Sequence, residues 1–219
     1  METRSNFHLS LEQLHTDLLR MGHRVEEQIH RAVDSLAKLD MMLAKETIQL
    51  DDEIDNMLIA IEDHCVRLIA LQQPIARDLR LISMAMKIVT DLERIGDHGV
   101  DIAKTTLQLT GETLVKPLVD IPQMAAKAME MLHQALKAYI DQDVSLAEQL
   151  APMDDEVDSL YSKIFEEVTA LMGTDRSTNR QLSHLLMVAR YLERIADHAT
   201  NIGEWVIYVV TGERRDLNI

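Results

Sequence analysis

The sequence is poor in the residues that build sheets, turns and disulfides. Aromatic residues make up only 3% of its 219 positions, and it contains 7 glycines and 4 prolines. Strands are therefore disfavoured, whereas the abundant Leu, Ala, Met, Ile, Glu and Gln favour helices. The single cysteine, Cys65, excludes an internal disulfide and a thiolate zinc site, and its place among apolar residues indicates core packing. We therefore predict an all-α protein.

Basic residues and long apolar runs are also scarce. The chain has 22 Lys and Arg against 37 Asp and Glu, a formal net charge of −15. Because no basic face is available to neutralise phosphates, no nucleic-acid partner is expected. No segment approaches the roughly twenty apolar residues that span a bilayer, and the N-terminus does not resemble a signal peptide. We expect a cytoplasmic protein that reaches a membrane only through partners.

Two stretches of the chain occur twice. Residues 92–102 read LERIGDHGVDI, and residues 192–202, one hundred positions later, read LERIADHATNI. The acidic run at 51–55 returns at 154–158. Internal repeats of this kind set the architecture of a protein. The chain is therefore expected to consist of two similar halves.

Apolar residues at helical spacing predict three helices in each half. In the first half Asp40 is a candidate N-cap, Pro74 ends the second helix and Gly111 follows the third. The second half repeats this order, with Asp143 in the place of Asp40 and a linker before it at about 111–123. We predict two tandem three-helix bundles, six long antiparallel helices in all, over residues 1–112 and 113–219. The expected helices span about 9–39, 40–73 and 75–110, then 124–140, 143–172 and 174–211.

Acidic residues in the repeated stretch recur every four positions, which places them along one face of a helix. Stacked like charges cost about a few tenths of a kcal/mol per pair unless a positive group neutralises them. Other acids border the core on the preceding helix of each half, so two packed helices would bring carboxylates together. The candidate metal ligands are Glu93, Asp97, Asp101, Glu193, Asp197, Asn201, Asp51, Asp55, Asp154 and Asp158.

Two interpretations of these acids remain open. In the first interpretation the acids form solvated faces with local ion pairs, since four basic residues each stand three residues from an acid: Arg94, Arg190, Arg194 and Lys104. Alternatively they hold a cation, since Glu93 has no basic residue at the positions facing it and both halves repeat the arrangement. Oxygen ligands suit magnesium, calcium or manganese and also hold iron; zinc stays open as well.

Two histidines directly follow aspartates of the repeat. His98 and His198 therefore point about 100° away from Asp97 and Asp197. They are expected on the helix surface or between the bundles, and could join a metal site only from its rim.

The residues Gln73-Pro74, Ala76–Arg80 and Asp91–Asp97 closely resemble the first half of the PhoU family. Glu193–His198 and Trp205–Val210 resemble its second half, so the likeness covers nearly the whole chain. The resemblance implies a regulator of phosphate uptake associated with the phosphate ABC transporter, including its ATPase subunit, and with a sensor histidine kinase. It implies that the phosphate regulon is held off when phosphate is plentiful. It also implies metal clusters on the acidic motifs; whether the chain forms a homodimer is left open.

The second half departs from the family pattern in two places. Asn201 replaces an acid, so the second half is expected to bind fewer ions or to bind them more weakly. The segment with Asp78 and Arg80 has no counterpart around 178–180, so any contact of these two residues is expected from the first half alone. Helix start with local pairing, and contact with a partner, are both open for them.

Two alternative functions follow from other interpretations of the same acids. One is a helical scaffold that binds no metal. Another is a carboxylate-bridged dimetal enzyme, but that class places Glu-x-x-His motifs inside the bundle core, and the repeated motif lacks them. No nucleophile–base arrangement or phosphate-binding glycine loop is visible. A non-enzymatic signalling adaptor is therefore the predicted function.

Overall fold

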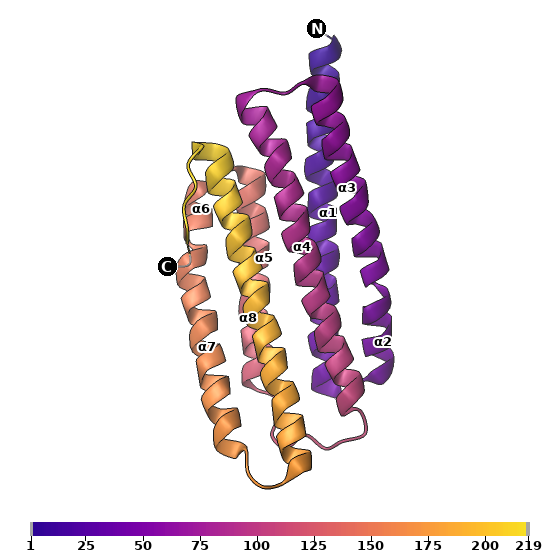
Figure 1. Ribbon diagram of the computed structural model, residues 1–219, viewed down its shortest axis with the longest axis vertical. Helices are drawn as coiled ribbons and strands as arrows, with labels where there is room; N and C mark the ends of the chain where they lie inside the picture. Colours follow the sequence, from indigo (N-terminus) through magenta and orange to yellow (C-terminus); the bar gives the residue numbers. More distant parts are fainter. Residues whose placement is uncertain (1, 218–219) are drawn as a thin grey trace.

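The computed structural model describes residues 2–217, with side chains from Phe7 onward, and these residues form helices and connecting segments without any strand (Figure 1). The all-α prediction is confirmed. The helices are α1 (Glu2–Lys38), α2 (Met41–Gln49), α3 (Asp51–Gln72), α4 (Ala76–Leu109), α5 (Asp120–Asp141), α6 (Val144–Glu148), α7 (Leu150–Leu171) and α8 (Arg176–Thr211).

These segments make six rods, three in each half, as the repeats predict. Leu50 separates α2 from α3, and Gln149 separates α6 from α7. Both residues keep right-handed helical backbone angles, φ −65° and ψ −22° at Leu50 and φ −70° and ψ −12° at Gln149, so each rod continues through its interruption. Three acids in the first turn of α3 favour a new helix start at this point, because they complement the helix dipole.

Side-chain caps begin the second rod of each half. Asp40 accepts hydrogen bonds from the backbone N–H groups of residues 42 and 43. Asp143 accepts the equivalent bonds from residues 145 and 146, which confirms both predicted N-caps. At the other end of the chain Gly212 adopts φ +80° after α8, the left-handed conformation that favours glycine.

Two predicted boundaries were wrong. Helix α5 begins at Asp120, so the linker is shorter than residues 111–123. Pro122 is tolerated because it lies in the first turn, where its missing N–H has no partner within the helix. Helix α1 begins at Glu2, seven residues before the predicted start at Leu9.

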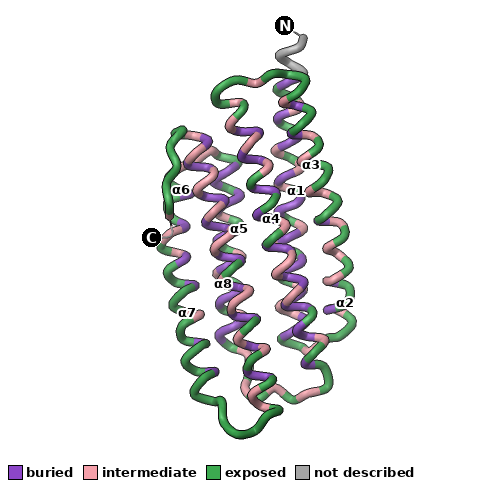
Figure 2. The backbone as a smooth tube through the Cα atoms, in the orientation of Figure 1, coloured by how far each residue is buried: buried purple, intermediate pink, exposed green. Residues whose placement is uncertain are grey.

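The two halves pack through α4 and α8, which run antiparallel at the centre of the molecule (Figure 1). Helices α1 and α5 lie behind this pair, and α3 and α7 flank it. The buried sides of the helices face one another (Figure 2) and belong to one continuous apolar core, in which Cys65 is fully buried. The boundary between residues 112 and 113 stays a prediction. Within residues 2–217 no helix combines the length and apolarity needed to cross a bilayer.

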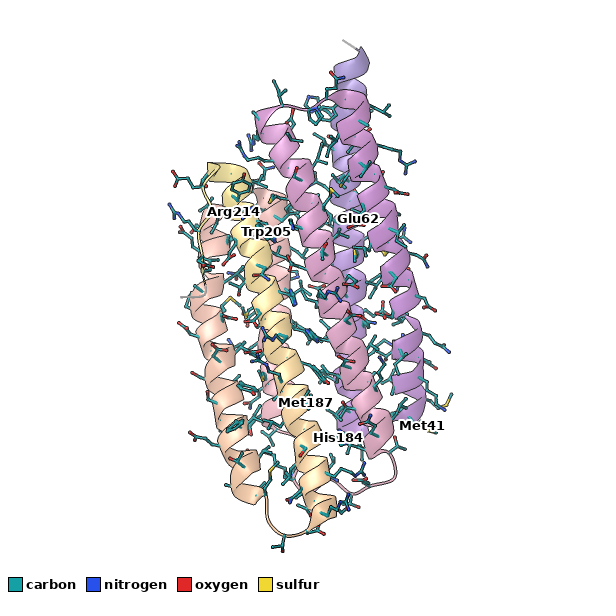
Figure 3. The ribbon with its side chains drawn as sticks, in the orientation of Figure 1. Met41, Glu62, His184, Met187, Trp205 and Arg214 are labelled. Atoms are coloured by element: carbon teal, nitrogen blue, oxygen red, sulfur yellow. The ribbon has the colours of Figure 1, made fainter. Side chains whose placement is uncertain are left out.

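A buried carboxylate joins α4 to α8. Asp91 is 9% exposed and accepts hydrogen bonds from three side chains of α8: Trp205 Nε1 at 2.8 Å, His198 Nδ1 at 2.9 Å and Asn201 Nδ2 at 3.4 Å. Figure 3 labels Trp205 near the C-terminal end of α8, where Arg214 lies over its ring at 5.7 Å from the centroid. Nothing in the helical periodicity indicates that one side chain would hold three donors of the other half.

The contact between α4 and α8 has an approximate two-fold arrangement, in which His98 and Tyr191 correspond to His198 and Asp91. Position 191, one hundred residues after Asp91, is a tyrosine, and His98 stacks on Tyr191 with ring centroids 5.7 Å apart. The ring centroids of His98 and His198 lie 6.0 Å apart. Of the two predicted places, the helix surface and the space between the bundles, both histidines occupy the second. Burial, followed by the charge of His198, lowers the pKa of His98 to about 4. His98 is therefore neutral at physiological pH.

Arg80 also acts between the halves. A Cβ placed on Gly212 would lie 3.8 Å from Arg80 Cζ, so the guanidinium faces the C-terminal end of α8. A cation is favourable at that end of a helix. Asp78 lies in the first turn of α4, which agrees with a helix-start role. Contact of either residue with a partner stays a prediction.

We expect Asp91→Ala to destabilise the protein by about 2 kcal/mol, because the partly buried N–H groups of Trp205 and His198 lose their acceptor. Asp63→Ala, at an exposed position of α3, is the matched control and should cost under about 0.5 kcal/mol. Urea unfolding followed by circular dichroism measures both. Equal stability of the two variants would contradict the structural role of Asp91.

Candidate metal centre

Helices α3 and α4 bring four candidate ligands of the first half together. Asp51 and Asp55 come from α3, and Glu93 and Asp97 come from α4. Burial raises the pKa of Glu93, and the negative charges of the other three acids raise it further. Burial raises the pKa of Asp51, and the negative charges of Asp55 and Asp97 raise it further. These four carboxylates, here called the first acidic cluster, form one electrostatically coupled group.

Helices α7 and α8 build the second acidic cluster from Asp154, Asp158, Glu193 and Asp197. Asp154 is only 8% exposed. Burial raises its pKa to about 7, and the charges of Asp197, Asp158 and Glu193 contribute to the increase. The predicted meeting of carboxylates on neighbouring helices is thus present in both halves.

A partly buried hydrogen bond in the first cluster has no equivalent in the second. Gln28, on α1, donates from Nε2 to Asp51 Oδ1 at 3.2 Å. The equivalent position 103 residues later is Met131, a fully buried apolar side chain that offers no donor. The hydrogen bond from Gln28 stabilises the charged form of Asp51, whereas Met131 cannot stabilise the charged form of Asp154 in this way. A glutamine within the apolar stripe of α1 was the sequence signal for this contact, and sequence reasoning missed it.

Arginines of α4 and α8 neutralise part of each cluster. Arg94 Nη1 lies 2.9 Å from Asp97 Oδ2, and Arg194 Nη1 lies 3.0 Å from Asp197 Oδ2. Arg94 Nε also lies 3.4 Å from Glu93 Oε2, so Glu93 has a basic neighbour although none stands at the helix positions that face it. The side chain of the residue that directly follows Glu93 bends back toward it, which helix-face arguments do not anticipate. The predicted local ion pairs therefore exist.

Asp101 and Asn201 have partners outside the two acidic clusters. Asp101 Oδ1 is 3.8 Å from Lys104 Nζ, and burial raises the pKa of Asp101. Asn201 directs its amide to Asp91, where an aspartate would place a second negative charge beside a buried carboxylate. This contact gives a physical reason for the asparagine.

The chemistry of the donor set fits a hard cation, because all eight cluster side chains offer carboxylate oxygens. Glu193 Oε2 is buried without a hydrogen-bond donor, and Arg194 Nε lies 3.8 Å from it. In their present rotamers, no three His, Cys, Asp or Glu side chains among the described residues are close enough together to hold an ion. Binding therefore requires carboxylates to rotate away from the arginines. His98 and His198 lie between α4 and α8 and belong to neither cluster.

The fold and the clusters define a class: tandem three-helix bundles with a carboxylate cluster at the same place in each repeat. Residues 18–106 and 121–206 each match the PhoU domain, and the chain belongs to the PhoU family. It is 46% identical over 217 residues to a phosphate-specific transport system accessory protein PhoU homolog of Clostridium acetobutylicum, covering 99% of both chains. It is 34% identical over 207 residues to the Escherichia coli accessory protein PhoU, covering 94% of this chain and 86% of that protein.

Solved structures agree with this fold. The crystal structure of PhoU from Pseudomonas aeruginosa matches with a TM-score of 0.89 at 38% identity, over 94% of this chain and all of that one. The phosphate transport system regulatory protein PhoU from Streptococcus pneumoniae matches with a TM-score of 0.89 at 35% identity, over 96% and 99%. The tandem-bundle architecture predicted from the repeats is confirmed.

Asp154 should make the stability of the metal-free protein depend on pH. Its carboxyl has a pKa of about 7 when folded, against 3.8 as the ordinary value, so the folded state holds a proton that the unfolded state has lost. Stability from this group is therefore present below about pH 4 and is lost as pH rises to about 7. We expect Asp154→Asn to melt at a higher temperature than wild type at about pH 8 in chelator.

Asp51→Asn is the matched control and should give a smaller gain, because Gln28 donates to Asp51. Melting is followed by circular dichroism at pH values from about 4 to 8. Identical pH profiles for wild type and Asp154→Asn would contradict the proposed protonation of Asp154.

Proposed function

We propose that the protein is a non-enzymatic regulator of phosphate uptake that holds the phosphate regulon off when phosphate is plentiful. It acts as an adaptor between the phosphate ABC transporter, through the ATPase subunit, and a sensor histidine kinase. The observation that carries this proposal is the match of both repeats to the PhoU domain. It is supported by relatives named as accessory proteins of the phosphate-specific transport system and by the Streptococcus pneumoniae protein named as a regulator.

The acidic clusters give the adaptor a metal-binding function in this proposal. Asp51, Asp55, Glu93 and Asp97 hold the ion of the first half, and the four acids of the second cluster hold that of the second half. The bound cation neutralises carboxylates whose pKa values burial and mutual repulsion raise. Asp101 and Asn201 contribute from the edges. The identity of the ion, among iron, manganese, magnesium, zinc and calcium, is a matter for measurement.

The charge of the protein suits docking to basic surfaces. A net charge of −15 attracts a positively charged partner at a distance and makes association dependent on ionic strength. We therefore place the protein in the cytoplasm, in contact with the membrane only through cytoplasmic parts of the transporter and kinase. Its oligomeric state in these complexes is open.

Deletion of the gene should derepress phosphate-starvation genes in phosphate-rich medium, because the kinase is no longer held inactive. A reporter of the regulon measures this, with wild-type complementation as the control. Unchanged reporter activity in the deletion strain would contradict the regulatory proposal.

Complementation with Glu93→Gln, Asp97→Asn tests the metal function separately. This double variant should fail to restore repression, because its first cluster loses two ligands while the fold is kept. Immunoblotting and circular dichroism establish that the variant is present and folded. If the variant restores full repression, the regulatory proposal stands, and the proposal that regulation requires metal in the first cluster is contradicted.

A further inference from the structure

A second arginine lies inside the second acidic cluster. Arg190 Nη1 forms an ion pair with Glu193 Oε1. Burial and neighbouring acids raise the pKa of Asp158, and the positive charge of Arg190 opposes this rise across the helix pair. The guanidinium lies over the ring of Tyr161, with Cζ 5.9 Å from the centroid. Tyr161 and Asp158 belong to α7, whereas Arg190 and Glu193 belong to α8. Contacts from two helices thus hold this cation among the candidate metal ligands.

The first half has no counterpart of this cation. The position one hundred residues before Arg190 is Thr90, whose hydroxyl donates to the Met86 carbonyl of its own helix at 2.9 Å. The position equivalent to Tyr161 is Leu58, 103 residues earlier. Glu93 therefore meets Arg94 alone, whereas Glu193 meets both Arg190 and Arg194. The four carboxylates of the first cluster are paired with one guanidinium, and those of the second cluster with two. Lys104 also acts on Asp51 of the first cluster, but its ion pair is with Asp101.

We infer that Arg190 is a built-in counter-ion that competes with metal for the second cluster, so the first cluster takes up a divalent cation at lower concentration than the second. This inference rests on the proposed metal-binding function. An ion that enters the second cluster must displace Arg190 from Glu193 and is repelled by the additional positive charge. An ion that enters the first cluster displaces Arg94 and is also repelled by Lys104, which acts on Asp51 without forming an ion pair with any of the four cluster acids.

The two halves then bind metal over different ranges of cation concentration. Over a range of cation concentration the first cluster is loaded while the second remains paired with its arginines. Although the repeats are approximately symmetric, their metal affinities then differ. The difference comes from Arg190 on α8, whose guanidinium lies over the Tyr161 ring on α7.

Calorimetric titration of the full chain with Mn²⁺ at about pH 8, above the pKa of Asp154, tests this inference. Glu193→Gln, Asp197→Asn leaves the first cluster alone, and Glu93→Gln, Asp97→Asn leaves the second alone. We expect the isolated second cluster to bind Mn²⁺ about tenfold more weakly than the isolated first cluster.

Exchange of the distinguishing residues should exchange the affinities. Arg190→Thr in the protein that retains only the second cluster should tighten Mn²⁺ binding about tenfold. Thr90→Arg in the protein that retains only the first cluster should weaken it. Arg190→Lys keeps the charge and should leave binding weak, while Arg190→Gln keeps a long side chain without charge and should tighten it.

Lys137→Thr is the control for net charge. It removes one positive charge at the pair with Asp141 on α5, away from both clusters, and should change binding little. If Arg190→Thr and Arg190→Gln bind Mn²⁺ no more tightly than Lys137→Thr, or if the two isolated clusters bind equally, the counter-ion inference is wrong while the metal proposal stands. If no protein binds Mn²⁺, the metal proposal and this inference both fail.

Discussion

Repulsion between carboxylates at a helix–helix contact is the constraint on which the functional part of this structure depends. Each pair α3/α4 and α7/α8 directs four acids to one place, and half-burial of several of them limits solvation by water. Arginines of the same helices neutralise part of this negative charge. Burial and neighbouring acids raise the pKa of Asp154 to about 7, so a proton neutralises this carboxyl more readily than usual. We propose that metal supplies further positive charge. These three kinds of positive charge compete for the same oxygens.

The rigid frame for this competition is the contact between α4 and α8. The same helices carry the Asp91 network on one side and the acidic residues at 93, 97, 193 and 197 on another. Because Asp91 takes three donors from α8, a small change in the orientation of either helix would strain several hydrogen bonds together. The acidic clusters and the interface between the halves therefore depend on the same helices, and Asn201 belongs both to the Asp91 network and to the candidate ligands.

Much of the fold could be predicted from the sequence because its determinants are local. Asp40 and Asp143 cap helices through backbone groups two and three residues away, and the repeats were visible at fixed offsets. The pairing of carboxylates followed from helical geometry. The Asp91 network and the contact of Arg190 with the Tyr161 ring could not be predicted, because each depends on how side chains from distant segments are oriented after packing. Gln28 was visible as a polar residue in the apolar stripe of α1, but its partner Asp51 was not. The return of Arg94 to Glu93 depends on a rotamer, which spacing does not determine.

Anomalous diffraction from crystals grown with Mn²⁺ tests the central claim, that the facing carboxylates hold a cation. We expect a peak between α3 and α4 within about 2.6 Å of oxygens of Glu93 and Asp97, with weaker occupancy between α7 and α8. In the loaded protein Arg94 should have moved away from both acids. Ordered clusters without an anomalous peak, and with Arg94 still paired to Asp97, would show that the acids are neutralised by the protein alone.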